Sequence, residues 1–221
     1  FAEETLFTQA NTEYENRGYS EAISLYDSII LKGLESTELY YNLGNCYYKI
    51  QDWANAIWHY EKSLKLNTTN KNTSHNLQLT KLRLIDQIEP IPQLFYKKWR
   101  KNLVNLLSTK KWQTLALLCI WIILIIQLLN RFLNYKKKYF TAFFNALTLI
   151  LLLITYSSYQ ENHSKTEAII FSSSVVVNSA PTENSTNLFS LHSGTKVELI
   201  EQIGTWINIT LKNGNSGWIK K

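Results

Sequence analysis

The hydrophobic pattern of the chain changes twice, and each change predicts a different kind of element. Up to residue 89, apolar residues recur every three or four positions, which is typical of amphipathic helices. Two long uncharged runs follow, over residues 112–130 and 139–160. From residue 167 onward, apolar and polar residues alternate in short segments, as in strands. This order predicts a helical domain, a pair of apolar helices and a small all-β domain.

Each uncharged run is long enough to cross a membrane. About 20 helical residues at roughly 1.5 Å each span a hydrocarbon core of about 30 Å. We therefore expect transmembrane helices at residues 112–130 and 139–157, joined by a basic hairpin turn at residues 131–138. The turn carries Arg131, Lys136, Lys137 and Lys138. The alternative is a pair of buried helices in a soluble bundle, although such helices rarely lack charge on every side.

The positive charge of the chain is concentrated beside these runs. The net charge is +6, but residues 1–89 hold 8 basic and 12 acidic side chains, and residues 90–138 hold 10 basic and no acidic ones. A basic stretch next to apolar runs favours lipid, not nucleic acid, as the partner. Residues 90–111 alternate aromatic, aliphatic and basic positions at helical intervals, which predicts an interfacial amphipathic segment. Its expected lipid-facing cations are Lys97, Lys98, Arg100 and Lys101.

The charge pattern alone leaves the orientation of the hairpin open. Four basic residues in the turn favour a cytoplasmic turn under the positive-inside rule. Six basic residues between positions 97 and 111 favour the opposite orientation.

Residues 1–70 contain an internal repeat with a period of 34. The aligned pairs are Leu6 with Tyr40, Ala10 with Gly44, Tyr14 with Tyr48, Ala22 with Ala56, Ile23 with Ile57 and Tyr26 with Tyr60. This pattern resembles the tetratricopeptide repeat (TPR), with one copy at residues 1–36 and a second at 37–70. A capping helix is expected at residues 71–89, ended by Pro90 and Pro92. The small residues Gly44 and Ala56 are expected where the two helices of a repeat cross.

The TPR resemblance implies a concave face, built from the first helix of each repeat, that binds an extended peptide or a partner helix. The residues expected there are Phe7, Asn11, Tyr14, Tyr41, Asn42, Asn45, Tyr48, Asn76 and Arg83. Asn42 and Asn76 match positions where family members hold a partner's backbone or carboxylate, but Glu4 and Asn72 stand where a lysine would complete a carboxylate clamp. The asparagines are alternatively just the common residue at that repeat position. Cys46 is expected to be a packing residue, not a redox centre.

The last segment resembles a bacterial SH3 domain. After a linker at residues 158–166, residues 167–221 contain short alternating strands separated by turns with Gly, Asn and Ser, which predicts a small all-β barrel. The ending Gly214-Asn215-Ser216-Gly217-Trp218-Ile219 carries most of the resemblance. In that family the module binds cell-wall peptides or protein partners. Trp206 and Trp218 are the expected groove residues, with a core position as the alternative for Trp218.

The sequence contains no pattern that indicates catalysis. Its two cysteines and four histidines lack metal-ligand spacing. A nucleophile elbow, a Gly-rich phosphate loop and an H-E-x-x-H motif are also absent from the sequence. We expect no cofactor and no metal, and predict that the chain is not an enzyme.

The complete order of segments resembles the BatE family of the Bacteroides aerotolerance (Bat) operon. The resemblance implies a two-span protein of the bacterial inner membrane with both soluble domains in the periplasm. It also implies export through a signal peptide, and the absence of Met with a start at Phe1 predicts that an N-terminal segment has been removed. The implied partners are other Bat proteins, von Willebrand factor A-domain membrane proteins and a MoxR-type ATPase.

The expected fold class is a multidomain membrane protein with an all-α TPR superhelix, two transmembrane helices and a small SH3-like barrel. The preferred function is a non-catalytic membrane-anchored adaptor of a Bat-type aerotolerance or envelope-stress complex. In it, the TPR groove recruits protein partners, and the SH3-like module binds cell wall or a second partner. The alternative is a cell-wall peptide sensor that signals through the membrane hairpin. Peptidoglycan is a candidate ligand in both, and nucleic acid in neither.

Overall fold

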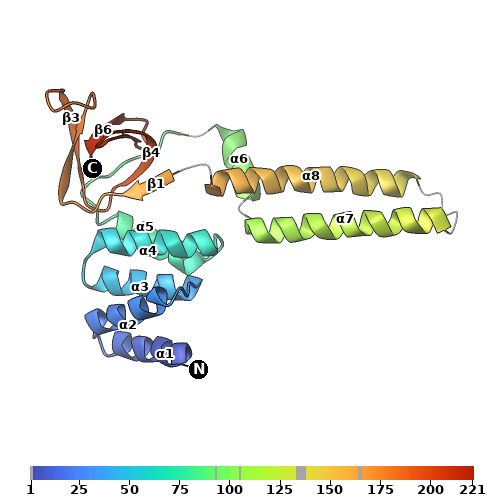
Figure 1. Ribbon diagram of the computed structural model, residues 1–221, viewed down its shortest axis with the longest axis horizontal. Coiled ribbons are helices and arrows are strands. Elements are labelled where there is room, and N and C mark those ends of the chain that lie inside the picture. The colour runs from blue at the N-terminus through green and yellow to red at the C-terminus, as the bar shows by residue number, and fades with distance from the viewer. Residues whose placement is uncertain (1, 93, 105, 133–137, 164–165) are drawn as a thin grey trace. The chain divides into compact units, whose positions relative to one another are not determined.

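The computed structural model describes residues 2–92, 94–104, 106–132, 138–163 and 166–221 (Figure 1). The chain forms two compact units. One consists of Phe1–Pro92 together with Lys165–Lys221, and the other of Gln93–Ser164. The first unit contains the helical repeats and the β-domain, and the second contains the long apolar helices.

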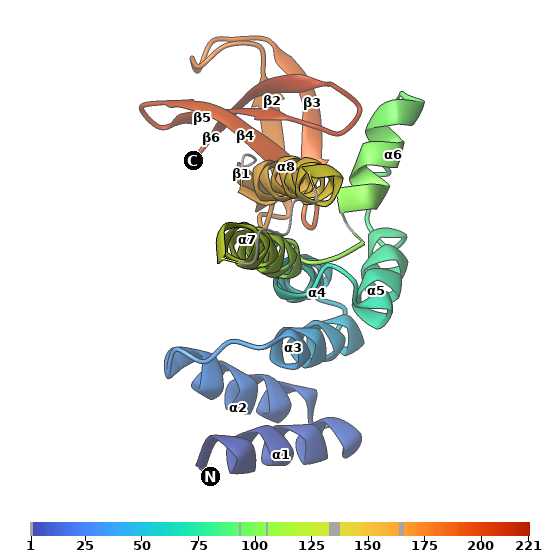
Figure 2. The ribbon, with the colours of Figure 1, turned by 90° about the vertical axis from the view of Figure 1, so that its right-hand side faces the viewer.

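The N-terminal helices follow one another in antiparallel hairpins. They are α1 (Ala2–Glu15), α2 (Tyr19–Leu31), α3 (Thr37–Lys49), α4 (Trp53–Leu66) and α5 (Lys71–Lys81), and each packs against the next (Figures 1 and 2). Side chains of Ser36, Asp52 and Asn70 cap the starts of α3, α4 and α5 by accepting a backbone N–H three residues on. Arg17 and Gln51, which are 34 residues apart, both adopt a left-handed φ in the turn inside each hairpin. The sequence period is therefore also a period of the backbone.

Small residues allow the helices of the second hairpin to approach closely, as expected. A Cβ atom on Gly44 would lie 2.5 Å from the ring of Tyr60, which is itself buried. Ala56 is completely buried on α4. In the first hairpin, Ala10 and Tyr26 occupy the equivalent positions and are also completely buried. The tight crossing of α3 and α4 thus depends on the missing side chain at position 44.

The capping helix is shorter than expected. It ends at Lys81, and residues 86–92 have no regular secondary structure. Ile88, which the helical spacing assigned to the cap, packs against the core of the β-domain instead. The backbone N–H of Ile91 donates to the carbonyl of Lys212 at 3.1 Å. The segment after the helix thus contacts the β-domain through Ile88 and Ile91.

The C-terminal domain is a six-stranded antiparallel sheet with the strand order β1-β4-β5-β6-β2-β3. The strands are β1 (Thr166–Ile169), β2 (Ser174–Asn178), β3 (Asn187–His192), β4 (Lys196–Ile203), β5 (Trp206–Thr210) and β6 (Ser216–Lys220). Its core contains Val177, Leu191, Val197 and Ile209. The all-β prediction is confirmed, but the predicted closed barrel is not found. Among the described strands, β1 pairs only with β4 and β3 only with β2, so the sheet has two open edges.

The second unit holds α6 (Phe95–Val104), α7 (Thr109–Phe132) and α8 (Lys138–His163). Helices α7 and α8 lie side by side (Figure 1), and Thr109–Leu129 and Tyr139–Gln160 are each long and apolar enough to cross a membrane. In the most apolar part of each, only 11% and 6% of the residues are buried. Large side chains such as Trp121 and Phe143 therefore face outward, unlike those of the core helices of a soluble bundle.

Helix α8 continues to His163, through the beginning of the linker expected at residues 158–166. Ser158 is almost completely buried, and its hydroxyl lies 2.8 Å from that of Thr109 at the start of α7. Trp112, a residue typical of membrane interfaces, is also buried, and its indole N–H donates to the carbonyl of Val104 on α6. Contacts among α6, α7 and α8 thus keep this end of α8 helical.

Candidate functional site: the asparagine ladder of the repeats

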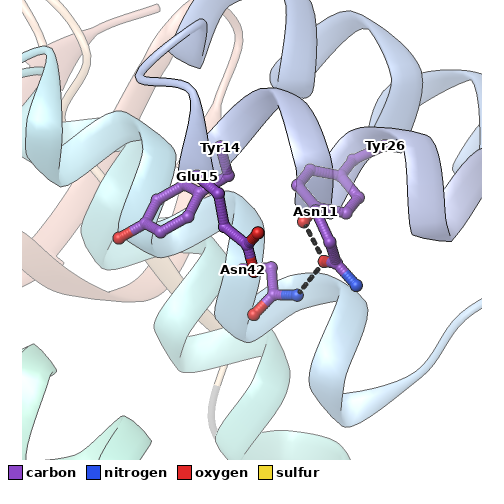
Figure 3. A pocket seen from close by; sticks show the side chains of 5 residues that line it. All are labelled: Asn11, Tyr14, Glu15, Tyr26 and Asn42. Carbon is purple, nitrogen blue, oxygen red and sulfur yellow. Dashed lines mark hydrogen bonds between the residues drawn. The ribbon is translucent and has the colours of Figure 1, made fainter.

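One asparagine links three helices of the first repeat pair. The side-chain carbonyl of Asn11 on α1 accepts a hydrogen bond from the hydroxyl of Tyr26 on α2 at 2.5 Å. The same oxygen accepts a second bond from the amide of Asn42 on α3 at 3.0 Å (Figure 3). Asn11 thereby connects α1 and α2 to the first helix of the next repeat.

The same arrangement recurs 34 residues later. The side-chain carbonyl of Asn45 on α3 accepts from the hydroxyl of Tyr60 on α4 at 2.7 Å and from the amide of Asn76 on α5 at 2.8 Å. That amide also donates to the hydroxyl of Tyr41 at 3.3 Å. We call Asn11, Tyr26, Asn42, Asn45, Tyr60 and Asn76 the asparagine ladder. It joins α1, α3 and α5 into one face, the first-helix face.

Burial raises the pKa of both tyrosines of the ladder. The pKa of Tyr26 is raised to about 12, and that of Tyr60 is raised well above its usual value. Both hydroxyls therefore remain donors at neutral pH. Asn42 and Asn76 thus each bond to the preceding repeat, and a role of these asparagines in holding a partner stays a prediction.

A shallow pocket lies beside the ladder on the first-helix face. It has a volume of about 270 Å³ and is lined by Asn11, Tyr14, Glu15, Tyr26 and Asn42 (Figure 3). Tyr14 and Glu15 come from the end of α1, and Glu15 is exposed. The pocket offers amide groups, an aromatic edge and one carboxylate, which suits a polar or basic peptide segment.

The other residues expected on the concave face take more varied positions. Phe7 packs against Tyr26, with ring centroids 5.7 Å apart. Tyr48 packs edge-on against Trp53 at 5.3 Å. Arg83 is exposed and lies beyond the end of α5. The structure therefore brings Asn11, Tyr14 and Asn42 together, and places Arg83 outside the last helix of the face.

The two tryptophans of the β-domain share one face of the sheet. Trp206 on β5 pairs with Lys220, and Trp218 on β6 pairs with Asn208, so the rings are diagonal neighbours on adjacent strands. Ile207, Ile209 and Ile219, which alternate with these positions, pack in the core on the opposite face. Trp218 is thus half-buried and lies on the face opposite the sheet core.

The expected lipid-facing residues lie in the second unit. Lys97, Lys98, Arg100 and Lys101 are on α6, where Phe95 and Trp99 are also exposed, at 85% and 69%. Arg131 lies in the last turn of α7, and Lys138 begins α8. Lys136 and Lys137 of the hairpin turn lie outside the described residues.

Cys46 is not a reactive cysteine. It is completely buried on α3, and burial raises the pKa of its thiol to about 12. A thiolate is the nucleophilic form, so this thiol is inert at neutral pH. Within the part of the chain that the structure describes, no group of three or more His, Cys, Asp or Glu side chains could hold a metal ion.

A second polar cluster joins the repeats to the β-domain, and sequence reasoning missed it. Glu61 on α4 pairs with Lys81 on α5 and with Lys196 on β4, both at 2.9 Å. Lys196 also pairs with Glu167 on β1 at 2.7 Å. Asp86, in the segment after α5, contacts His192 and Thr195. Charged residues that are far apart in the sequence give no periodic pattern. Such a cluster is therefore found only from the three-dimensional structure.

Comparison with a family model supports the assignment of the second repeat. A family model described as "Tetratricopeptide repeat" matches residues 37–70, which form α3, α4 and the turn after them. The crystal structure of MamA protein is similar with 15% sequence identity and a TM-score of 0.34, over 76% of this chain and 79% of that chain. A search of curated proteins finds no match. The chain is therefore a protein that contains a tetratricopeptide repeat.

Proposed function

We propose that the chain is a non-catalytic, membrane-anchored adaptor whose first-helix face recruits a segment of a partner protein. TPR domains mediate protein–protein interactions, and the asparagine ladder is the observation that carries the proposal here. It fixes the spacing of α1, α3 and α5 and leaves the pocket at Tyr14 and Glu15 open beside it. A face held rigid in this way loses little conformational entropy when a partner docks.

The anchor in this proposal is the pair α7 and α8. Their outward-facing apolar side chains would be costly in water and favourable in lipid. Helix α6 supports the same proposal because its cations accompany exposed Phe95 and Trp99, the combination that binds a membrane surface. By resemblance to the BatE family, the membrane is the bacterial inner membrane, and the partners are other Bat proteins, von Willebrand factor A-domain proteins and the MoxR-type ATPase system.

In the same proposal, the β-domain binds a second partner or cell wall through Trp206 and Trp218. The face that these half-buried tryptophans share supports this role, as does the resemblance of residues 167–221 to bacterial SH3 domains. The alternative function is a cell-wall peptide sensor. The polar contacts between the β-domain and the repeats favour it, because they would couple a ligand on the sheet to the first-helix face.

The adaptor proposal is tested by co-purifying partners with the full chain from detergent. A charged residue in place of Asn42, Asn45 or Asn76 would break the ladder. A better variant is Glu15→Lys, which reverses the charge of the exposed carboxylate of the pocket. Glu21→Lys is the matched control because Glu21 is an exposed acid on α2, outside the first-helix face. We expect Glu15→Lys to lose a partner that the control retains. An unchanged partner set in Glu15→Lys would exclude the pocket from binding.

The sensor alternative is tested by sedimentation of the full chain with purified peptidoglycan. A Trp206→Ala and Trp218→Ala double variant is compared with the parent chain. If the alternative holds, the parent chain co-sediments and the double variant does not. A parent chain that stays in solution counts against sensing and leaves the adaptor proposal intact.

Orientation is tested by labelling intact cells with a membrane-impermeant maleimide. We propose periplasmic soluble domains, so Lys137→Cys in the hairpin turn should react only after the cells are permeabilised. Ser24→Cys, exposed on α2, should react once the outer envelope is opened and the inner membrane is intact. The reverse pattern would place the repeats in the cytoplasm.

A further inference from the structure

The turn between β3 and β4 surrounds a carboxylate with three donors. The backbone N–H of His192 and the hydroxyl of Thr195 both donate to the same oxygen of Asp86, Oδ2, each at 2.6 Å. The ring Nδ1 of His192 lies 2.8 Å from the other oxygen. Thr195 is almost completely buried. These bonds lower the pKa of Asp86, although burial alone would raise it, so the carboxylate is ionised at neutral pH.

All three donors belong to the β-domain, whereas the carboxylate belongs to the segment after α5. Neighbouring residues of that segment contact the same domain. Gly194 adopts a left-handed φ in this turn. Leu84 packs directly against it, because a Cβ atom added to Gly194 would lie 2.3 Å from the Leu84 methyl carbon Cδ2. Ile88 packs against the sheet core, and Ile91 bonds to Lys212 through its backbone. One acid and three aliphatic residues thus contact the β-domain in the way that a bound peptide does, through both side chains and backbone.

From these contacts we propose that the β3–β4 turn is a recognition site for a peptide carboxylate flanked by aliphatic residues, and that residues 84–91 occupy it as an internal ligand. An acidic–aliphatic segment of a partner protein would compete for the same donors. This inference deepens the proposed second binding role of the β-domain but requires neither the Trp206–Trp218 face nor the first-helix face. It also gives the β-domain a state in which its peptide site is already filled.

The internal ligand is held in a way that permits exchange. Residues 86–92 have no secondary structure of their own, and Leu82 and Ile85 on either side of Leu84 are exposed. Because the segment is tethered, its effective concentration at the site is high, of millimolar order, so a free peptide competes poorly with it. Weakening the internal ligand should therefore uncover the site.

The test measures binding of a fluorescein-labelled peptide with the sequence of residues 82–92 to the full chain in detergent, by fluorescence anisotropy. We expect the Asp86→Ala chain to bind this peptide at least about tenfold more tightly than the parent chain. A peptide carrying Asp86→Asn should bind the Asp86→Ala chain at least about tenfold more weakly. Adding Thr195→Val to the Asp86→Ala chain should weaken binding in the same way.

Glu89→Ala is the matched control, because Glu89 is an exposed acid of the same segment. This chain should bind the peptide no better than the parent chain. The Asp86→Asn chain, which keeps the side-chain size, serves as the second variant if Asp86→Ala melts early by circular dichroism. Equal peptide affinity of the parent chain and both Asp86 variants would overturn the proposal. Equal affinity of the unmodified peptide and the Asp86→Asn peptide for the Asp86→Ala chain would also overturn it. Neither result bears on the adaptor proposal, which the Glu15→Lys co-purification tests independently.

Discussion

Glu61 and Lys196 are 135 residues apart in the sequence, and their side chains pair at 2.9 Å. Glu61 belongs to the second repeat and Lys196 to the β-domain, so this pair joins two segments separated by the whole apolar hairpin. Burial alone would raise the pKa of Glu61, but the charges of Lys81 and Lys196 outweigh it and lower that pKa. The repeats and the β-domain therefore fold as one unit with a shared polar junction.

Glu61→Gln should destabilise this junction. The Glu61 and Lys196 side chains are only 25% and 15% exposed, so removing the carboxylate charge leaves Lys196 with Glu167 alone and Lys81 without its partner. We expect the free energy of unfolding of the full chain to fall by about 1–3 kcal/mol. Urea unfolding followed by circular dichroism measures the change.

The matched control is Glu183→Gln. Glu183 also pairs with a lysine, Lys220, but the Glu183 side chain is 72% exposed. Exposed pairs contribute about 0–1 kcal/mol, so this variant should unfold almost like the parent chain. If Glu61→Gln and Glu183→Gln lower the free energy of unfolding equally, the Glu61 pair contributes no more than an exposed surface pair.

The asparagine ladder predicts a measurable coupling between Asn45 and Tyr60. Asn45→Ala leaves the buried Tyr60 hydroxyl and the Asn76 amide without their shared acceptor, so it should cost about 1–3 kcal/mol. Tyr60→Phe removes one donor from the pair. A double-mutant cycle of the two substitutions should give a coupling energy of about 1 kcal/mol.

Asn55→Ala provides the comparison for that cycle. The backbone N–H and the side-chain amide of Asn55 on α4 both bond to Asp52 at the start of the same helix. Its coupling with Tyr60→Phe should be close to zero, because the two side chains share no partner. Additive effects of Asn45→Ala and Tyr60→Phe would mean that their hydrogen bond does not contribute to stability.

The sequence predicted the repeats well because their signals are periodic. A small residue at position 44 and large aromatic ones at positions 26 and 60 recur at fixed spacing, and the close contact of Gly44 with Tyr60 confirms the prediction. The apolar helices were equally predictable, since a long uncharged run is itself the signal. The hydrogen bonds of the ladder follow the same 34-residue period, although a period alone does not tell which atoms bond.

Contacts between distant segments could not be predicted in this way. The aliphatic spacing of residues 79–88 predicted a longer capping helix, because Ile88 suits a helix as well as it suits the edge of a sheet core. Asp86 and Glu61 each look like ordinary surface acids in the sequence. Asp86 bonds to His192 on β3 and Glu61 pairs with Lys196 on β4, and the positions of these strands depend on tertiary packing.

Gly44→Ala should destabilise the second hairpin although alanine is the better helix former. The new methyl would meet the Tyr60 ring at 2.5 Å, and that ring is held by its bond to Asn45. Overpacking of this kind costs about 1–3 kcal/mol, more than the gain of about 1 kcal/mol in helix propensity. We therefore expect a net loss in thermal unfolding experiments.

Ala10→Gly is the complementary variant, because Ala10 occupies the equivalent position in the first hairpin with its methyl already accommodated. It should also destabilise the chain, by about 1 kcal/mol, through lost packing and helix propensity. A stabilised Gly44→Ala chain would indicate that Tyr60 moves aside easily, and that the crossing does not require glycine.

His59 predicts acid sensitivity of the repeats in a defined pH range. Its ring stacks on Tyr47 at 5.1 Å and meets the edge of Trp58 at 4.6 Å, and within the described residues its Nδ1 has no hydrogen-bond partner. Burial lowers the pKa of His59 from 6.5 to about 4. Between these values the unfolded chain binds more protons than the folded chain, so stability falls as the pH falls.

His59→Phe keeps an aromatic ring in this stack and removes the titrating group. The parent chain should lose up to about 3 kcal/mol of stability as the pH falls from 6.5 to 4, and the variant should lose much less over that range. The contribution of Glu61 is separable, because its pKa is lowered from 4.5 and its loss occurs only below that pH. His75→Gln is the control, since His75 is an exposed histidine on α5. Urea unfolding at pH 7, 5.5 and 4.5 gives the comparison, and equal pH profiles for the parent and His59→Phe chains would assign the acid sensitivity to other groups.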